Sequence, residues 1–507
     1  MEGAAAVLGS YTLVLGLALP VAARVRAAVG DRALGTGGAL AFAAASLGCG
    51  LAGSLGALLA LRGVQAVGAA AVLVGAFALV DAGGAGRRAW TAAAIFGFAA
   101  GPALGGALTQ ALDWRAIFLC QVPIAAVAAV AAWQAPEPSV READAEAWTA
   151  GPAIALALVS AALVGVLFLL VLLLVTGWSV TPLAAAAAVS VLPVTAVGAA
   201  RVRGPARVRA ATGAALVGGG VLALASLPGA SVWWTVLPQV LAGAGMGLAL
   251  PALAGELLPE RTPEQAARLL AARHIGITVA LVLLAPIAAT GIDDAVADGR
   301  EQGTALVLDA RLPPLEKLAL AGSLVGDLDP VDPRGRLQAS LDRARSGIDP
   351  EDRATYATLA RRADDALVTG VQDAFAPAFA ICGALALLAA LAVLPRDRRG
   401  LTIVAATGAA VLALGAGARL ALPALEPDPV RIADPCVERA LPDTGGVDGA
   451  LQDVALVALD RAACRHGSSR EKLALALVDD GARADYEREY GVDPREIGGL
   501  LGAVLGR

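Results

Sequence analysis

Few side chains in this sequence could do chemistry, and the most notable of them lie within long apolar runs. Arg62 and Gln65 are three residues apart, so a helix would place them on the same face. A guanidinium in an apolar membrane interior costs about 2.5–3.5 kcal/mol even on the lenient insertion scale, so it normally faces a partner or a water-filled cavity. The alternative is that Arg62 lies near an interface and extends its charged end to water. We expect a functional Arg62, with Gln65 able to hydrogen-bond a bound molecule.

Three further titratable residues lie at the edges of apolar runs. Arg273 and His274 open one run, where the arginine is explained by simple anchoring and the histidine could titrate in the physiological range. A structural histidine at a helix end is the alternative for His274. Asp373 begins another run directly after a polar, acid-rich stretch, and a solvated position is the alternative to a coupling role.

The composition is that of a polytopic membrane protein. The chain is 57% hydrophobic with only 16% charged residues, and its mean hydropathy is +0.70. Apolar runs of about 18 or more residues recur, and each could cross about 30 Å of hydrocarbon as a helix. We therefore predict an all-α transmembrane bundle. The predicted spans are 4–24, 35–55, 57–80, 90–111, 114–133, 151–175, 181–199, 210–228, 232–255, 270–291, 369–395 and 401–422.

Polar stretches divide the chain into six regions. They are an N-terminal membrane half (1–133), a linker (134–150), a C-terminal membrane half (151–292), a polar insertion (293–368), two last spans (369–423) and a polar tail (424–507). Turn and capping signals predict helices over 334–346 and 351–367 in the insertion. In the tail they predict three helices. The first covers 449–465, the second begins at a Ser468–Glu471 capping box, and the third runs from Asp493 to about Leu505. No basic region that would indicate a cleavable signal peptide precedes the first apolar run.

Arginine placement predicts the orientation. Short loops on one side are rich in arginine, and those on the other carry little beyond Arg115. The positive-inside rule makes the arginine-rich loops, among them those with Arg87 and Arg207, cytoplasmic. The insertion, the tail and the C-terminus then lie outside the inner (plasma) membrane. Outside the cytoplasm, Cys436 and Cys464 are expected to form a disulfide that stabilises the tail by about 3 kcal/mol. Metal binding with His466 is the less complete alternative.

One apolar span carries small residues at regular spacing around a proline. Gly97, Gly101 and Gly105 are four residues apart, and Pro102 and Gly106 follow directly after two of them. Such spacing favours close approach of a neighbouring helix, and the proline bends the span there. With the Asp113–Phe118 stretch that follows, this segment resembles the fifth and sixth spans of the drug:proton antiporter branch of the major facilitator superfamily.

Other segments resemble the same family. Leu61–Ala70 is similar to its fourth-span motif, Thr176–Leu183 to the turn between its seventh and eighth spans, Leu241–Pro251 to its glycine-rich tenth span, and Arg273–Gly276 to its eleventh. Two features depart from the pattern. The chain opens at what resembles the second span, so that either a preceding span is missing or the protein is a diverged member. The aspartate of the following loop motif is replaced by Ala27, with Asp31 nearby.

The resemblance implies a secondary transporter that exports small hydrophobic or amphipathic molecules in exchange for protons, without a cofactor and without nucleic acid. Its partners are then a small-molecule substrate, protons and the lipid bilayer. The competing hypothesis is a membrane scaffold that displays its outer regions to an envelope protein. An enzyme is the least favoured class, because the sequence offers no nucleophile–base pair and no metal-ligand cluster.

Overall fold

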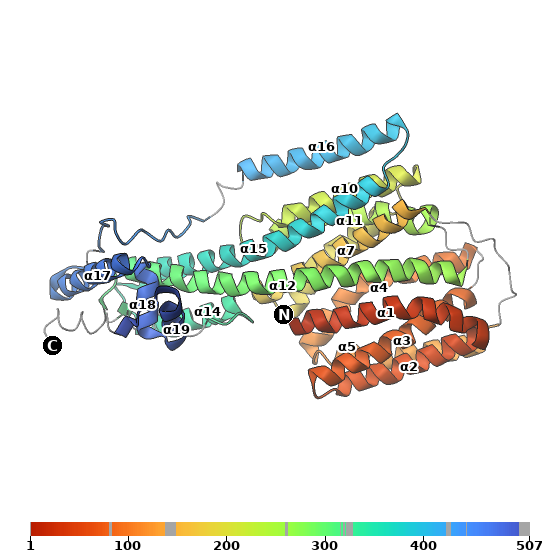
Figure 1. Ribbon diagram of the computed structural model, residues 1–507, viewed down its shortest axis with the longest axis horizontal. Coiled ribbons are helices and arrows are strands. Elements are labelled where there is room, and N and C mark those ends of the chain that lie inside the picture. Colours follow the sequence, from red (N-terminus) through yellow and green to blue (C-terminus); the bar gives the residue numbers. More distant parts are fainter. Residues whose placement is uncertain are drawn as a thin grey trace.

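The structure is a long bundle of helices with a smaller head at one end (Figure 1). This computed structural model describes residues 2–80, 84–136, 149–258, 262–314, 316–317, 320, 328–421, 427–442 and 444–495. Within these residues every regular element is helical.

The N-terminal half of the bundle is built on small residues. Its elements are α1 (Glu2–Val29), α2 (Asp31–Leu51), α3 (Leu55–Leu79), α4 (Gly84–Ala111), α5 (Ala116–Leu119) and α6 (Gln121–Gln134). At the contact of α2 with α3, a Cβ added to Gly38 or Gly68 would lie only 2.7 Å from a backbone nitrogen of the other helix. Glycine is therefore required for these two backbones to approach so closely.

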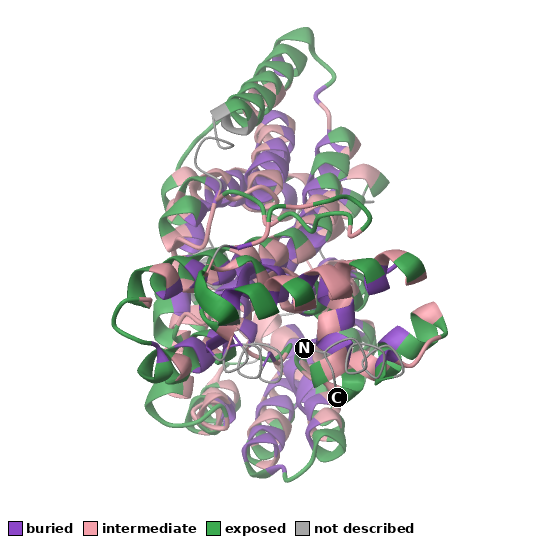
Figure 2. Ribbon diagram, turned by 90° about the vertical axis from the view of Figure 1, so that its left-hand side faces the viewer, coloured by how far each residue is buried: buried purple, intermediate pink, exposed green. Residues whose placement is uncertain are grey.

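The C-terminal half contains the larger apolar core. Its elements are α7 (Ala150–Leu172), η1 (Leu173–Gly177), α8 (Pro182–Val189), α9 (Val191–Ala199), α10 (Ala206–Leu224), η2 (Val232–Thr235), α11 (Val236–Pro251), η3 (Ala252–Leu257), α12 (Pro263–Asp309) and α15 (Arg353–Ala392). The side chains of α7 and η1 from Ala155 to Leu174 are largely buried in it. The extra helix α16 (Arg398–Ala421) packs on α10 at the edge of the bundle and is largely exposed (Figure 2).

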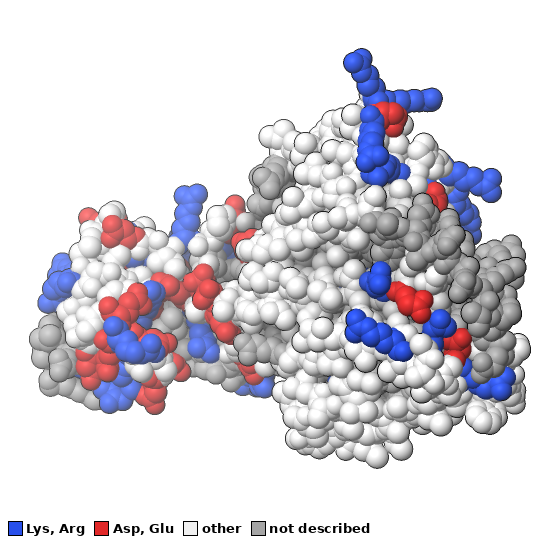
Figure 3. All heavy atoms as spheres, turned by 45° about the vertical axis from the view of Figure 1, so that its right-hand side comes forward, with Lys and Arg blue, Asp and Glu red and all other residues white. Residues whose placement is uncertain are grey.

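The length and composition of these helices fit a membrane protein. Eleven segments of the described chain are long and apolar enough to cross a bilayer, and α4 covers the remaining predicted span, 90–111. On the face shown in Figure 3, charged side chains gather on the head and at the opposite end of the bundle, and the surface between them is almost free of charge. An uncharged belt of this kind is what a hydrocarbon layer requires.

The insertion is less separate from the membrane bundle than the sequence predicts. α12 has 47 residues and α15 has 40, so at 1.5 Å per residue they are about 70 and 60 Å long. Both helices therefore continue beyond the bundle as one packed stalk. The predicted helix over 351–367 is the outer part of α15 rather than an independent element.

The head consists of α14 (Pro333–Ala344), η4 (Arg345–Gly347), α17 (Gly446–His466), α18 (Arg470–Val478) and α19 (Asp480–Tyr490). α17 ends at Gly467, which adopts a left-handed conformation as a helix-ending glycine commonly does. The cap of α18 is Ser469, whose hydroxyl accepts from the Lys472 amide. Ser468 instead hydrogen-bonds Tyr486. α19 was not predicted, and most of the helix expected from Asp493 lies outside the described residues.

The tail is attached to the stalk by buried charge. Arg470 is fully buried and donates to Asp309 at the end of α12 (2.6 Å) and to Glu471 (3.0 Å). Arg439 pairs with Glu471 and Asp460 on its other side. Burial raises the pKa of Asp460, although the two arginines act in the opposite direction. Removing one partner of such a buried pair typically costs about 3–5 kcal/mol. The expected disulfide between Cys436 and Cys464 is present.

The orientation gives a direct labelling prediction. A cysteine at Ser346, which is exposed on η4, should react with a membrane-impermeant maleimide in intact cells when the free cysteines Cys49, Cys120 and Cys382 are replaced. A cysteine at Val202, in an arginine-rich loop at the other end of the bundle, should react only after lysis. The reverse pattern would invert the assigned orientation.

Candidate functional site

Arg62 lies in a buried polar network. Its Nη1 donates to Gln65 Oε1 (2.6 Å), and its Nε donates to the carbonyl of Val7 (3.3 Å). Gln65 in turn donates to Ser46 Oγ (2.7 Å) and to Gln121 Oε1 (3.0 Å). The network therefore joins α1, α2, α3 and α6, and the one-turn spacing of Arg62 and Gln65 places both on the face of α3 that points into it.

The positive charge of Arg62 has aromatic neighbours in place of a carboxylate. Its guanidinium carbon lies 4.0 Å from the ring centroid of Tyr11 and 5.6 Å from that of Phe118. Among the described residues, no acidic side chain comes within ion-pair distance of it. The side chain is only 8% exposed, so the alternative of an arginine that extends to water is not what the structure shows. A cation held by π faces and neutral acceptors remains available to an anion or a polar ligand.

His274 lies at the contact between the two halves. We expected it at the cytoplasmic start of its span, but α12 begins at Pro263, so His274 is about 16 Å along the helix. A Cβ added to Gly16, midway along α1, would lie 3.5 Å from the His274 Cβ. His274 Nδ1 lies 2.7 Å from the Leu270 carbonyl, which can only accept, so Nδ1 carries the proton and Nε2 is the free acceptor.

Two more polar contacts cross between the halves along α1 and α12. One turn beyond His274, Thr278 Oγ1 donates to Thr12 Oγ1 (2.9 Å). At the end of the bundle opposite the head, Arg26 pairs with Asp31 (3.1 Å) in its own half and with Glu264 (3.3 Å) at the start of α12. Asp31 is only 8% exposed and so provides a buried carboxylate. It lies close to Ala27, which occupies the position where the family's loop motif has its aspartate.

The glycine motif packs differently from our prediction. Only Gly106 meets another helix, because a Cβ there would lie 2.5 Å from the Ala186 side chain and 2.7 Å from the Pro182 carbonyl of α8. At Gly97, Gly101 and Gly105 an added Cβ would meet no described atom within 4 Å. The prediction of close packing along this stripe is therefore wrong. Gly106 is one residue, or about 100°, further around the helix, and that face contacts α8.

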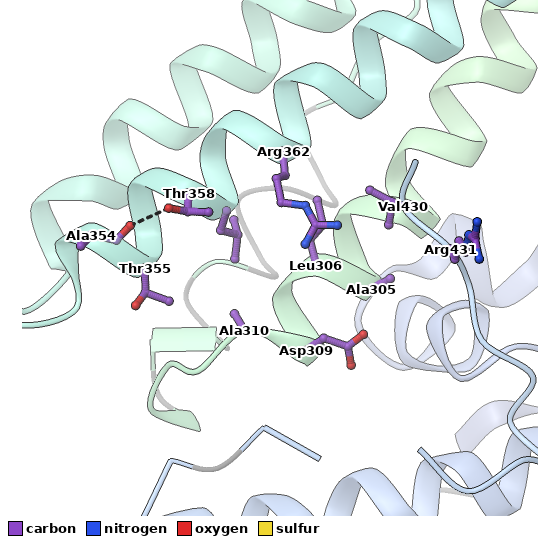
Figure 4. Close-up of a pocket in the computed structure, with 11 residues that line it drawn as sticks. Ala305, Leu306, Asp309, Ala310, Ala354, Thr355, Thr358, Arg362, Val430 and Arg431 are labelled. Atoms are coloured by element: carbon purple, nitrogen blue, oxygen red, sulfur yellow. Dashed lines mark hydrogen bonds between the residues drawn. The ribbon is translucent and has the colours of Figure 1, made fainter. Parts of the chain in front are cut away.

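Asp373 lies away from the other candidates. It is part of α15 and lines a hollow of about 660 Å³ at the base of the stalk, together with Asp294, Asp298 and Asp428. A second hollow, of about 490 Å³, lies further out between α12, α15 and the segment containing Val430 (Figure 4). There the Arg362 side chain points from α15 toward Leu306 of α12. The first hollow reaches into the ends of the predicted spans 270–291 and 369–395, whereas the second lies beyond them.

The structure thus brings together some of the predicted residues and not others. Arg62 and Gln65 form one network, Arg273 and His274 lie on α12 at the contact between the halves, and Asp373 is in the stalk. No sequence pattern indicates Ser46 or Thr278, which look like ordinary residues of an apolar helix. Gln121 could have been found, because an amide inside an otherwise apolar span needs a partner.

Comparison with known proteins identifies the family. The Major Facilitator Superfamily model matches residues 2–285, more than half of the chain. The chain belongs to the major facilitator superfamily. The matched region covers both halves up to the middle of α12, while the stalk and head lie beyond it.

Named relatives come from the drug-efflux branch. Multidrug resistance protein Stp of Mycobacterium tuberculosis is 38% identical over 133 residues, which cover 25% of this chain and 25% of that protein. Putative multidrug resistance protein MdtD of Escherichia coli is 33% identical over 133 residues, or 25% of this chain and 28% of that protein. The matched stretch thus spans about a quarter of the length of these relatives.

Packing at the glycine motif predicts different outcomes for two adjacent substitutions. Gly106→Leu should separate α4 from α8 and lower the melting temperature of the purified protein, because overpacking a close helix contact typically costs about 1–3 kcal/mol. Gly105→Leu, the matched control, should leave the melting temperature within about one degree of the wild-type value because its face is open. Equal destabilisation by both substitutions would contradict the described contact.

Proposed function

We propose that this protein is a secondary transporter that exports small hydrophobic or amphipathic molecules and couples export to inward movement of protons. The observation that carries the proposal is the buried Arg62 network in a member of this superfamily. A guanidinium without a carboxylate partner is costly in a membrane span, and its retention favours a role in binding or coupling.

Helix α1 offers a route from this network to the contact between the halves. Tyr11 lies against the Arg62 guanidinium, and the next residue, Thr12, hydrogen-bonds Thr278 of the other half. A change in what Arg62 binds would alter the position of α1 and so the Thr12–Thr278 contact. The Arg26–Glu264 ion pair would then hold the cytoplasmic ends of the halves together when the outer side opens.

His274 is the proposed proton carrier. Its Nε2 is the free acceptor at the contact between the halves, so protonation there would place a new positive charge between α1 and α12. Arg273, the residue before it, lies equally far along α12, and its Nε is buried with no hydrogen-bond partner in the described part of the chain, so we assign it no anchoring role at the membrane surface. The substrate class is proposed from the names of the relatives, two of which describe multidrug resistance.

Substitution of Arg62 tests the binding or coupling role. Arg62→Ala should lower efflux of a lipophilic cation dye from everted vesicles by about 10- to 100-fold, the equivalent of one or two charge-assisted hydrogen bonds. Gln65→Ala should have a smaller effect, because it removes a neutral partner only. Normal transport by an Arg62→Ala protein that inserts normally would limit Arg62 to a structural role. Absence of proton-driven flux in the wild-type protein, across a broad dye panel, would favour the scaffold hypothesis instead.

Substitution of His274 tests proton coupling separately from substrate movement. His274→Gln can still donate to the Leu270 carbonyl but cannot titrate, so efflux should lose its stimulation by a pH gradient. Exchange of labelled for unlabelled substrate without a gradient should persist. His466→Gln, at the only other histidine in the chain, is the matched control and should retain the gradient response. If His274→Gln also retains it, another group carries the proton.

A further inference from the structure

The turn between α7 and α8 has an unusual backbone. α7 ends in the π-helical turn η1, and Ser179 follows with φ of 55°. Among the described residues it is the only one other than glycine with a positive φ. A non-glycine residue in this region is strained and persists only where its surroundings hold it in place. The surroundings of Ser179 are therefore informative.

The polar insertion supplies the contacts that hold this turn. Ser179 Oγ donates to Asp332 Oδ1 (2.7 Å), and the same oxygen of Asp332 accepts from the Gly335 amide at the start of α14 (3.1 Å). Arg334 Nη1 donates to the Trp178 carbonyl (3.3 Å). The N-terminal end of α14 is thus hydrogen-bonded to two successive residues of the α7–α8 turn, Trp178 and Ser179.

The other side of the same helix is fixed to the stalk. Arg334 forms a two-pronged ion pair with Asp364 of α15, with distances of 2.9 Å to Oδ1 and 2.7 Å to Oδ2. Both side chains are 20% exposed, which makes the pair stronger than a surface salt bridge. Tyr356 of α15 also donates its hydroxyl to the Leu341 carbonyl of α14. Arg334 therefore links the α7–α8 turn directly to α15.

All the elements that carry the head belong to the C-terminal half. In the described part of the chain, hydrogen bonds and ion pairs connect α14 and α18 to the α7–α8 turn, to α12 and to α15, and α17 is attached through α18. Ser469 and Arg470 of α18, for example, bind Glu301 and Asp309 of α12. The contacts between the halves, such as Thr12–Thr278, lie within the bundle and do not pass through the head.

We propose that α14 is a strut that fixes the stalk and head to the outer end of the C-terminal half, so that they move with this half as one rigid body and turn relative to the N-terminal half during transport. The inference rests on the proposed function, because it requires the two halves to move against each other. As a consequence, the position of the head follows that of the C-terminal half, and anything that holds the head also restrains this half. A head bound to both halves would instead oppose their separation.

Paired cysteines compare the α14 strut with the Thr12–Thr278 contact, which must break when the two halves move apart. In a background with Cys49, Cys120 and Cys382 replaced by alanine, one variant carries Ser179→Cys with Asp332→Cys, and the matched variant carries Thr12→Cys with Thr278→Cys. Each pair replaces two side chains that hydrogen-bond each other, and mass spectrometry after alkylation verifies that each disulfide has formed. Oxidation of the Ser179/Asp332 pair should leave dye efflux within about twofold of its reduced level. Oxidation of the Thr12/Thr278 pair should lower it at least about tenfold. Loss of efflux on oxidation of the Ser179/Asp332 pair would overturn the proposal.

A distance measurement separates failure of the strut from failure of the proposed function, because it needs no transport. Spin labels in the same background are attached at Ser346 in the head with Trp233 in the C-terminal half, or at Ser346 with Asp113 in the N-terminal half. All three sites are exposed. Between pH 5 and pH 8, the Ser346–Trp233 distances should stay in one narrow distribution, whereas the Ser346–Asp113 distances should broaden or shift. A Ser346–Trp233 distribution as broad as the Ser346–Asp113 distribution would overturn the strut. Two narrow distributions would instead contradict movement of the two halves against each other, and with it the proposed function.

Discussion

The continuity of α12 is the constraint on which the rest of the structure depends. An α-helix satisfies its own backbone hydrogen bonds, so it can leave a membrane and continue into water without a break. α12 does so over 47 residues despite Pro286. Glu264 at its start contacts Arg26, Thr278 in its middle contacts Thr12, and Asp309 at its end receives Arg470. One rigid element therefore joins the Arg26–Glu264 ion pair, the contact between the halves and the head.

Charged side chains are distributed along the protein according to the free-energy cost of burying them. In the head, where water is close, arginines and carboxylates occur together in a compensated cluster around Arg470. In the bundle, Arg62 is held by a glutamine, a carbonyl and two aromatic rings instead. Neutral partners lower the cost of burial without cancelling the charge, and the remaining charge is what a ligand could use. The two environments suit a structural role for Arg470 and a functional one for Arg62.

Much of the fold could be predicted from the sequence, because the length of apolar runs and the bias of arginine act locally. The Arg62–Gln65 pair was visible for the same reason, since helical spacing fixes which residues share a face. Contacts between distant segments were not visible. Nothing in the spacing of Ser46, Thr12 or Thr278 indicates a partner, and the helix start at Pro263, which moves His274 to the middle of the contact, depends on a Thr262 cap within a polar stretch.

The glycine motif shows why spacing alone does not select a helix face. Gly97, Gly101 and Gly105 form the regular stripe, yet the close contact with α8 is made by Gly106. A four-residue repeat turns by about 40° at each step, so the stripe drifts around α4, whereas the contact with α8 needs only one small residue where the two helices cross. The small residue that this close approach requires is therefore set by where α4 crosses α8 and not by the four-residue repeat.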